Sequence, residues 1–432
     1  MAPLHHCATW LATASALGAL CAGSVQAQDL SGQLRSTWAG RQAASAGPLA
    51  QANALAPGLA PAQASAATVQ AEWQATGRLG GADGVHLHTS VTLQAQRPEG
   101  GPGQTQGWVN EAVASGAAGP WQWSVGKQVV SWDVGYAFRP NDLVQQEARR
   151  TLVPATLQGR PLLMAEHFSA DTAWSLVAVN PTHGRSATGA EEPALAARVY
   201  RRAGEVDWHG FARWGIRTAG SAGVAASWVA SDALELHASV RHMAHFDTLA
   251  SASTASAAPP GTALLANNPW QPALGASATQ ALVGGTWTNE HQVSLLAEAW
   301  YDGTALSPAQ WRQWTARNRG LPTWRALGVP ATAVAGNLAW QASAFNANSA
   351  SANLHRQNLF ARLSWTQGAW QPALDVLWHP ADGGRLWTAS LTWQGDRVKL
   401  EAGWRTSGGP ASAVVRQLPV QRQGYVMGAW AF

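Results

Sequence analysis

Two pairs of polar side chains have a spacing that could support chemistry. His86 and His88 form one pair, and Asp207 and His209 form the other. Residues two apart project from the same face of a β-strand, so either pair could chelate a metal ion or join a serine-based hydrolytic site. A catalytic base also needs a third group that orients it, and the sequence indicates none. Histidines scattered along a wet surface are the simpler explanation, so we expect no catalytic residue, no metal and no other cofactor.

Several well-known chemical motifs are absent from the sequence. It has no phosphate-binding loop, dinucleotide-binding fingerprint, HExxH or CxxC motif. Cys7 and Cys21 are its only cysteines, and both lie in the predicted N-terminal leader, so the rest of the chain has no disulfide or thiolate site. The formal net charge is +4 and the basic residues are dispersed, which gives no nucleic-acid-binding footprint.

The composition indicates which elements hold these polar residues. Charged residues make up 12% of the chain, and there are 25 Trp against 7 Phe. No stretch after the leader approaches the length of about 18 consecutive apolar residues that a membrane-spanning helix needs. Few charges, many tryptophans and no long apolar run are together typical of a membrane β-barrel. Its lipid-facing residues alternate with lumen-facing ones along each strand and so form no continuous apolar stretch.

Strand-like alternation places the charged residues on one face. The clearest segments are 85–93, 206–217, 234–241, 358–365 and 398–405. Apolar residues take one set of alternate positions and charged residues take the other, as a division between lipid and lumen requires. We therefore expect the charged face to line a lumen. The predicted pore-lining residues are Arg213, Arg217, Arg241, Arg362, Arg405, Lys399, His209, His237, Glu205, Glu235, Glu298, Glu401 and Asp375.

The sequence predicts an all-β fold, a transmembrane antiparallel up-and-down β-barrel of about 18 strands, with 16 as the other possible number. The candidate strands are 29–38, 69–79, 84–95, 106–115, 120–131, 161–168, 171–179, 194–202, 205–216, 223–231, 233–243, 278–288, 291–301, 357–366, 369–378, 385–394, 397–406 and 423–432.

Strand direction decides how a further candidate strand, around 338–345, is treated. If the final strand runs toward the periplasm, counting 338–345 as a strand would place the longest connections on the periplasmic side, against the usual short-turn rule. We therefore assign this segment to a loop, in which Ser307 and Pro308 predict the start of a helix over 309–318. The predicted outer loops are 39–68, 132–160, 244–277, 302–356 and 407–422.

Aromatic residues fall near the strand ends at predicted outward positions. Near the periplasmic ends these are Trp121, Trp208, Trp228, Trp287, Trp365, Trp370, Trp393 and Trp430. Near the outer ends they are Trp108, Trp214, Tyr301, Trp378, Trp387 and Trp404. Trp and Tyr prefer both membrane interfaces. The alternative, a soluble β-sandwich with an aromatic core, does not explain two bands.

A charged segment follows Gly126-Lys-Gln-Val-Val-Ser-Trp132. The G-[KR]-Q…W opening and Pro140-Asn-Asp142 resemble a strand-to-inner-loop segment of porin-like barrels. The resemblance implies that the loop folds into the lumen and sets its constriction. An ordinary outer loop with solvated charges is the alternative. The predicted constriction-loop residues are Asp133, Arg139, Asp142, Glu147, Arg149 and Arg150.

The two ends of the chain agree with export to the outer membrane. The ending Tyr425-Val-Met-Gly-Ala-Trp-Ala-Phe432 resembles the C-terminal assembly signal of Gram-negative outer-membrane β-barrels. The resemblance implies recognition by the barrel-assembly machinery through Phe432 and Trp430. Residues 1–27 read as a signal peptide with an A-x-A-like site at Val25-Gln-Ala27, although the leader lacks Lys and Arg. We expect a single barrel over 28–432, exported through the periplasm to the cell outer membrane.

These observations predict a porin-like channel for passive uptake or efflux of small hydrophilic solutes. Barrels of about 16–18 strands enclose an aqueous lumen, and the excess of arginine among the lining residues predicts a weak preference for anions. Three alternatives are an outer-membrane secretion or assembly scaffold with a plugged lumen, a barrel hydrolase that depends on His209, and a transporter of long-chain apolar solutes. The charged inner positions argue against the last of these. Besides the assembly machinery, we expect outer-membrane lipid, lipopolysaccharide and the solutes as partners, and no nucleic acid. The sequence leaves the solute and the oligomeric state open.

Overall fold

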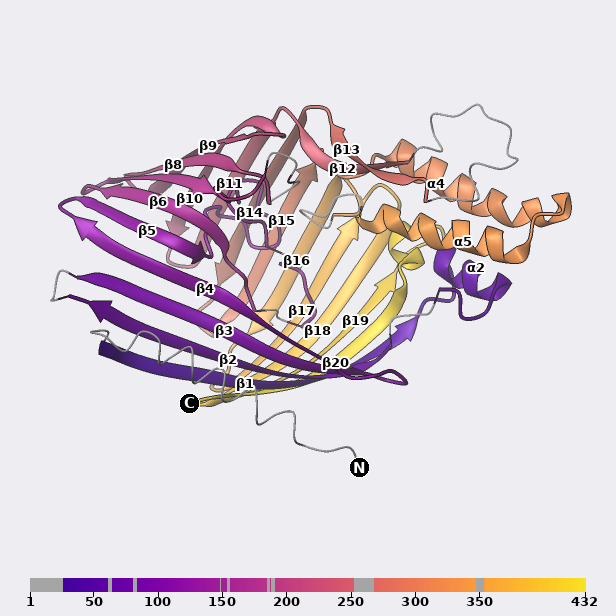
Figure 1. Ribbon diagram of the computed structural model, residues 1–432, viewed down its shortest axis with the longest axis horizontal. Helices are drawn as coiled ribbons and strands as arrows, with labels where there is room; N and C mark the ends of the chain where they lie inside the picture. Colours follow the sequence, from indigo (N-terminus) through magenta and orange to yellow (C-terminus); the bar gives the residue numbers. More distant parts are fainter. Residues whose placement is uncertain are drawn as a thin grey trace.

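Eighteen strands form one antiparallel sheet that closes on itself where β1 (Gln26–Ala43) pairs with β20 (Val420–Ala431) (Figure 1). The computed structural model describes residues 26–432 apart from 61–63, 81–83, 148, 154–155, 185–186, 188–190, 252–267 and 347–352. The predicted all-β barrel and its eighteen strands are therefore confirmed. Of the predicted signal peptide, residues 1–25 lie outside the described residues.

The other barrel strands follow one another around the wall in chain order. They are β2 (Ala66–Leu79), β3 (Val85–Pro98), β4 (Gln104–Ala118), β5 (Trp121–Gln128), β6 (Arg160–Phe168), β7 (Thr172–Val179), β8 (Ala194–Ala203), β9 (Val206–Gly215), β10 (Ala219–Ser231), β11 (Leu234–Met243), β14 (Ala278–Thr288), β15 (Val293–Asp302), β16 (Gln357–Trp365), β17 (Trp370–His379), β18 (Gly384–Gln394) and β19 (Val398–Gly408).

Long connections lie at the end of the barrel opposite the short turns. One of them is the two-stranded hairpin of β12 (Phe246–Ser251) and β13 (Trp270–Gly275), and another contains the short helix η6 (Val414–Gln417). Helices from two further loops form a cap that projects beyond this end (Figure 1). The cap consists of α2 (Pro48–Leu55), α4 (Pro308–Gly320), η4 (Leu321–Leu327), α5 (Ala331–Gln341) and η5 (Ala342–Asn346).

The helical cap confirms two predictions about the loop 302–356. Segment 338–345 is helical, in α5 and η5, and is not a strand. The Ser307 side chain accepts a hydrogen bond from the Gln310 backbone N–H, and the Gln310 side chain accepts one from the Ser307 backbone N–H. This capping box fixes the start of α4. No helix in the described part of the chain is long and apolar enough to cross a membrane.

The strand register separates an apolar outer face from a polar inner face. In β19, Leu400 and Trp404 are exposed on the outside, whereas Glu401 is buried on the inside. The predicted outward position of Trp108 is wrong. A bulge at Asn110 shifts the register of β4, so Trp108 pairs with the buried Thr92 and shares its inner face.

At the periplasmic end, the seam between β1 and β20 is closed by backbone hydrogen bonds and by close packing of an aromatic ring. The backbone N–H of Phe432 donates to the carbonyl of Gly32 at 2.9 Å, and the Gly32 N–H donates to the Phe432 carbonyl at 2.9 Å. A Cβ on residue 32 would lie 2.5 Å from the Phe432 ring, so only glycine leaves room for it. The ring of Trp430 lies 5.0 Å from that of Phe432.

Replacing Leu374 with arginine should impair folding in lipid. Leu374 is 47% exposed on the outer face of β17, halfway between the interfacial Trp370 and Trp378. An arginine at the bilayer midplane of a barrel costs about 2–4 kcal/mol. Ser390→Arg is the matched control, because Ser390 lies on the inner face of β18. Heat-modifiable electrophoresis should show a lower folded fraction for Leu374→Arg alone, and equal yields would contradict the assigned faces.

Candidate constriction site

The connection between β5 and β6, residues 129–159, folds back inside the barrel and packs against its inner wall. Trp132 and Leu143 join a buried cluster with residues of β6 to β10. Phe138 stacks on Trp300 of β15, with ring centroids 5.8 Å apart. Leu152 packs against residues of β1 and β20. This inner loop therefore lies across the lumen rather than over the outer surface.

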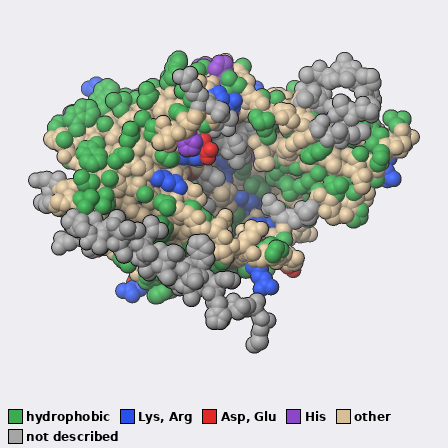
Figure 2. Space-filling model, viewed as in Figure 1, with side chains coloured by type: hydrophobic (Ala, Val, Ile, Leu, Met, Phe, Trp, Pro, Cys, Tyr) green, Lys and Arg blue, Asp and Glu red, His purple; other side chains and the backbone are tan. Residues whose placement is uncertain are grey.

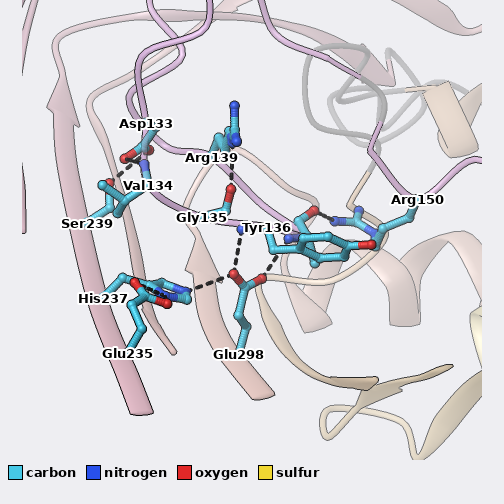
Figure 3. Close-up of polar contacts among 11 residues, drawn as sticks. Asp133, Val134, Gly135, Tyr136, Arg139, Arg150, Glu235, His237, Ser239 and Glu298 are labelled. Atoms are coloured by element: carbon cyan, nitrogen blue, oxygen red, sulfur yellow. Dashed lines mark hydrogen bonds and ion pairs between the residues drawn. The ribbon is translucent and has the colours of Figure 1, made fainter. Parts of the chain in front are cut away.

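A carboxylate on the barrel wall holds the middle of the inner loop (Figure 3). Glu298 of β15 accepts hydrogen bonds from the backbone N–H groups of Tyr136, at 2.6 Å, and Ala137, at 2.7 Å. His237 of β11 contacts the same carboxylate at 2.9 Å through Nε2 and lies 3.2 Å from Glu235 through Nδ1. Because Glu298 and His237 are both buried, this network fixes the loop backbone at one height in the lumen.

Two aspartates of the loop shape it and bind it to the wall. Oδ1 of Asp142 accepts hydrogen bonds from the Ser131 hydroxyl at 3.0 Å and from the Trp132 N–H at 3.1 Å. Asp133 accepts a bond from Ser239 of β11 at 2.9 Å (Figure 3). Burial raises the pKa of Asp142 to about 6 despite these donors, and burial also raises the pKa of Asp133.

The four other charged residues of the loop have different partners. Arg139 bonds to Ser131 within the loop, and Arg149 pairs with Glu147 at 2.7 Å. Arg150 donates to the Ala137 carbonyl at 2.6 Å and lies over the ring of Trp300, 5.0 Å from its centroid. Burial lowers the pKa of Arg150 to about 10, which leaves it charged at neutral pH. Arg150 therefore links two parts of the loop through the Ala137 carbonyl, whereas Arg149 contacts the nearby side chain of Glu147.

A cavity of about 300 Å³ lies between the inner loop and the wall formed by β16 to β20. On that wall Arg362 of β16 pairs with Asp375 of β17 at 3.3 Å, and Lys399 pairs with Glu401 at 2.8 Å. The Tyr136 ring, 45% exposed, borders it from the loop side. The charged lining residues are Arg149, Arg150, Arg362, Lys399, Arg405, Asp375 and Glu401. Five cations and two carboxylates thus surround the space that the loop leaves open.

Comparison with known proteins gives structural likeness without sequence likeness. No family model matches the chain, and no curated protein matches it. OccAB1 of Acinetobacter baumannii superposes with a TM-score of 0.53 at 10% identity, over 94% of this chain and 97% of that one. OccK5 (OpdH) of Pseudomonas aeruginosa gives 0.48 at 8% identity over 95% and 98% of the two chains. A mutant of the Rh. blastica porin gives 0.43 at 11% identity over 94% and 99%.

The closed sheet, its apolar exterior and the likeness to OccAB1 agree. The fold is that of a porin-like outer-membrane β-barrel. In the space-filling view, Lys and Arg side chains line the hollow in the middle of the molecule, and hydrophobic side chains spread over the surrounding wall (Figure 2).

Two predicted lining residues of the porin-like barrel also donate hydrogen bonds to the backbone of the inner loop. Arg241 is buried and donates to the Pro140 carbonyl at 3.2 Å. Arg405 donates to the Arg150 carbonyl at 2.8 Å and to Thr388. Together with Glu298 and His237, these side chains form the wall side of the loop contact.

The remaining predicted residues lie apart from the cavity. Arg213 pairs with the buried Glu192 at 2.8 Å near the outer end, and Arg217 pairs with Asp247 of the β12–β13 hairpin. His209 contacts Arg198 at 3.2 Å on the inner face. Glu205 lies in the turn between β8 and β9, where the indole of Trp228 donates to it at 3.4 Å.

The pair His86 and His88 and the pair Asp207 and His209 do not assemble into a larger cluster in the porin-like barrel. His88 lies 3.5 Å from Glu111, and His86 accepts a bond from Arg78 at 3.3 Å. Asp207 accepts a bond from Tyr200 at 2.6 Å. Among the residues that the structure describes, no group of three or more His, Cys, Asp and Glu is arranged to hold a metal ion.

Several residues that position the inner loop have little or no signal in the local sequence. Asn141 is fully buried and donates to Ser239 at 2.9 Å and to the Val240 carbonyl at 3.1 Å. A Cβ on Gly223 would lie 1.9 Å from the Asn141 side chain, so this glycine makes room for the loop. For Asn141, the Pro140-Asn-Asp142 motif is the only local sequence feature that indicates a role. No such feature exists for Ser239, because a serine is common among the polar residues of a strand.

Replacing Glu298 with alanine should loosen the inner loop of the porin-like barrel. The change leaves the N–H groups of Tyr136 and Ala137 without their acceptor, at a cost of about 1–3 kcal/mol for each buried group. Single-channel recordings should show noisier current with more frequent partial closures. Glu235→Ala is the control, because Glu235 touches His237 but not the loop. Recordings of Glu298→Ala as quiet as those of the control would show that this carboxylate does not hold the loop.

Proposed function

We propose that this chain forms a passive channel for small hydrophilic solutes and that the channel prefers anions. The observation that carries the proposal is the cavity beside the inner loop, where five cations face two carboxylates. A loop that crosses the lumen narrows the path for water, and charges at a narrow point are poorly screened. An anion therefore meets a favourable field at this position and a cation meets an unfavourable one.

The ion pairs keep the expected preference weak. Arg362 and Lys399 each have a carboxylate partner, at 3.3 and 2.8 Å, which cancels part of their field. Arg149 likewise pairs with Glu147 at 2.7 Å, whereas Arg405 donates to the Arg150 carbonyl at 2.8 Å and keeps its full charge. The balance favours small anionic or neutral hydrophilic solutes over cations.

Conductance across a planar bilayer tests the proposal. The refolded protein should give discrete conductance steps, and the reversal potential in a tenfold KCl gradient should have the sign of chloride preference. Absence of any conductance from correctly folded barrels would contradict the channel and favour a plugged scaffold. A reversal potential with the sign of potassium preference would contradict the selectivity alone.

A further inference from the structure

Two arginines project from the lipid-facing wall just beyond the outer aromatic band. Arg385 of β18 lies on the same face as Trp387, two residues earlier in the strand, and pairs across the sheet with Trp378. Arg422 of β20 lies on the same face as Val426, which is 60% exposed. Both arginines are exposed. They therefore stand outside the barrel, on the side that faces lipid.

The strand register gives their height relative to the membrane. Gly424, two residues from Arg422, pairs with Trp404 of the outer aromatic band, and Arg385 is likewise two residues beyond Trp387. Two residues advance about 6.8 Å along a strand, or about 5 Å along the membrane normal at barrel tilt. Indole rings prefer the boundary of the hydrocarbon, so the guanidinium groups lie at the level of the lipid headgroups.

The acidic residues nearest to these arginines are engaged by other groups. Neither Arg385 nor Arg422 contacts a side-chain partner within the described residues. From residue 382 onward the sequence has three acidic residues. Asp382 lies in the turn before β18, where its carboxylate bonds to His355 and to the backbone N–H groups of Gly384 and Val414. Glu401 faces the lumen, where it bonds to Tyr425, and Asp396 lies in the turn at the opposite, periplasmic end. Only β19 separates the two strands, so the arginines form one cationic patch about 10 Å wide.

We propose that Arg385 and Arg422 bind the phosphate groups of lipopolysaccharide in the outer leaflet. A guanidinium group presents a planar fork of donors that matches phosphate oxygens. The exposed indoles of Trp378, Trp387 and Trp404 just below offer an apolar surface to the acyl chains of the same molecule. The site rests on the outward orientation of the barrel and is independent of channel activity.

Binding of lipid A to the full-length protein in detergent micelles tests this site, measured by native mass spectrometry. The probes are bis-phosphorylated lipid A and the same lipid after dephosphorylation. Arg385→Gln combined with Arg422→Gln should weaken binding of the phosphorylated lipid on the order of tenfold, and the double Lys variant should retain most of it. The wild type should bind the dephosphorylated lipid as weakly as the double Gln variant binds the phosphorylated one.

Arg201→Gln is the matched control, because Arg201 is exposed on the outer wall at the periplasmic end, opposite Trp208. This variant should bind like the wild type. Equal affinity of the double Gln variant and the wild type would overturn the proposal. Displacement of lipid A by millimolar inorganic phosphate would also overturn it, since the site would then take any small anion. Heat-modifiable mobility of each variant establishes that the barrel is folded.

Discussion

Deletion of Phe432 should leave the chain exported but poorly inserted in the membrane. The residue contributes both backbone hydrogen bonds to Gly32 at the seam of the barrel, and its ring fills the space above that glycine. Without it, the final strand loses the last pair of bonds that join it to the first strand. The resemblance of the chain ending to a barrel-assembly signal points in the same direction, and we propose that the assembly machinery recognises this strand through Phe432 and Trp430. The heat-modifiable folded fraction should fall several-fold.

Two control variants distinguish the loss of the seam contacts from the loss of any aromatic residue at the membrane interface. Trp208→Ala removes an exposed aromatic residue near the periplasmic end of an internal strand, and its folded fraction should stay close to that of the wild type. Phe432→Tyr keeps both the backbone bonds and the ring, and should also fold. If the Phe432 deletion folds as well as the wild type, the seam does not depend on this residue.

Replacing Arg149 and Lys399 together with glutamate should turn the channel from anion preference to cation preference. Both side chains line the cavity, both are partly exposed, and neither braces the loop backbone. The double change alters the local charge by four units and also releases Glu147 and Glu401 from their pairs. In a narrow path with weak screening, this reverses the sign of the field. The reversal potential in a KCl gradient should change sign.

A matched control places the same change of charge elsewhere on the outer side. Arg312 and Arg319 lie on the exposed face of α4 in the cap, and their replacement with glutamate also alters the charge by four units. This variant should shift the reversal potential far less than the cavity variant. Equal shifts in the two variants would place the selective field at the mouth of the barrel and not at the inner loop.

Arg150 is unsuitable for charge reversal although it also lines the cavity. As a charged loop residue it resembles Arg149 in the sequence, yet its guanidinium donates to the Ala137 carbonyl within the loop and to the side chain of the distant Asn353. A glutamate there would break the loop, and a change in selectivity would then have no single cause. Local sequence cannot distinguish the two arginines, because their partners lie in distant parts of the chain.

The strands and their faces were predictable from sequence because the side-chain period of a strand is two and every strand meets the same lipid. Trp108 was assigned to the wrong face because one extra residue, Asn110, shifts the register without any marker in the local pattern. The residues that hold the inner loop were only partly predictable. Glu298 and Arg241 were expected on the inner face, but their contacts with backbone groups of the loop depend on how the barrel closes.

The inner loop also constrains the order in which the barrel can be assembled. It leaves the sheet at β5, but its partners arrive much later along the chain: Glu298 lies 162 residues after Tyr136, and Arg405 lies 255 residues after Arg150. The loop cannot make these contacts until β15 and β19 have joined the same sheet as β5. Once the first and last strands have met, the loop can reach the inner wall only through one of the two mouths of the barrel. Closure of the seam thus completes the membrane wall and confines the loop within it.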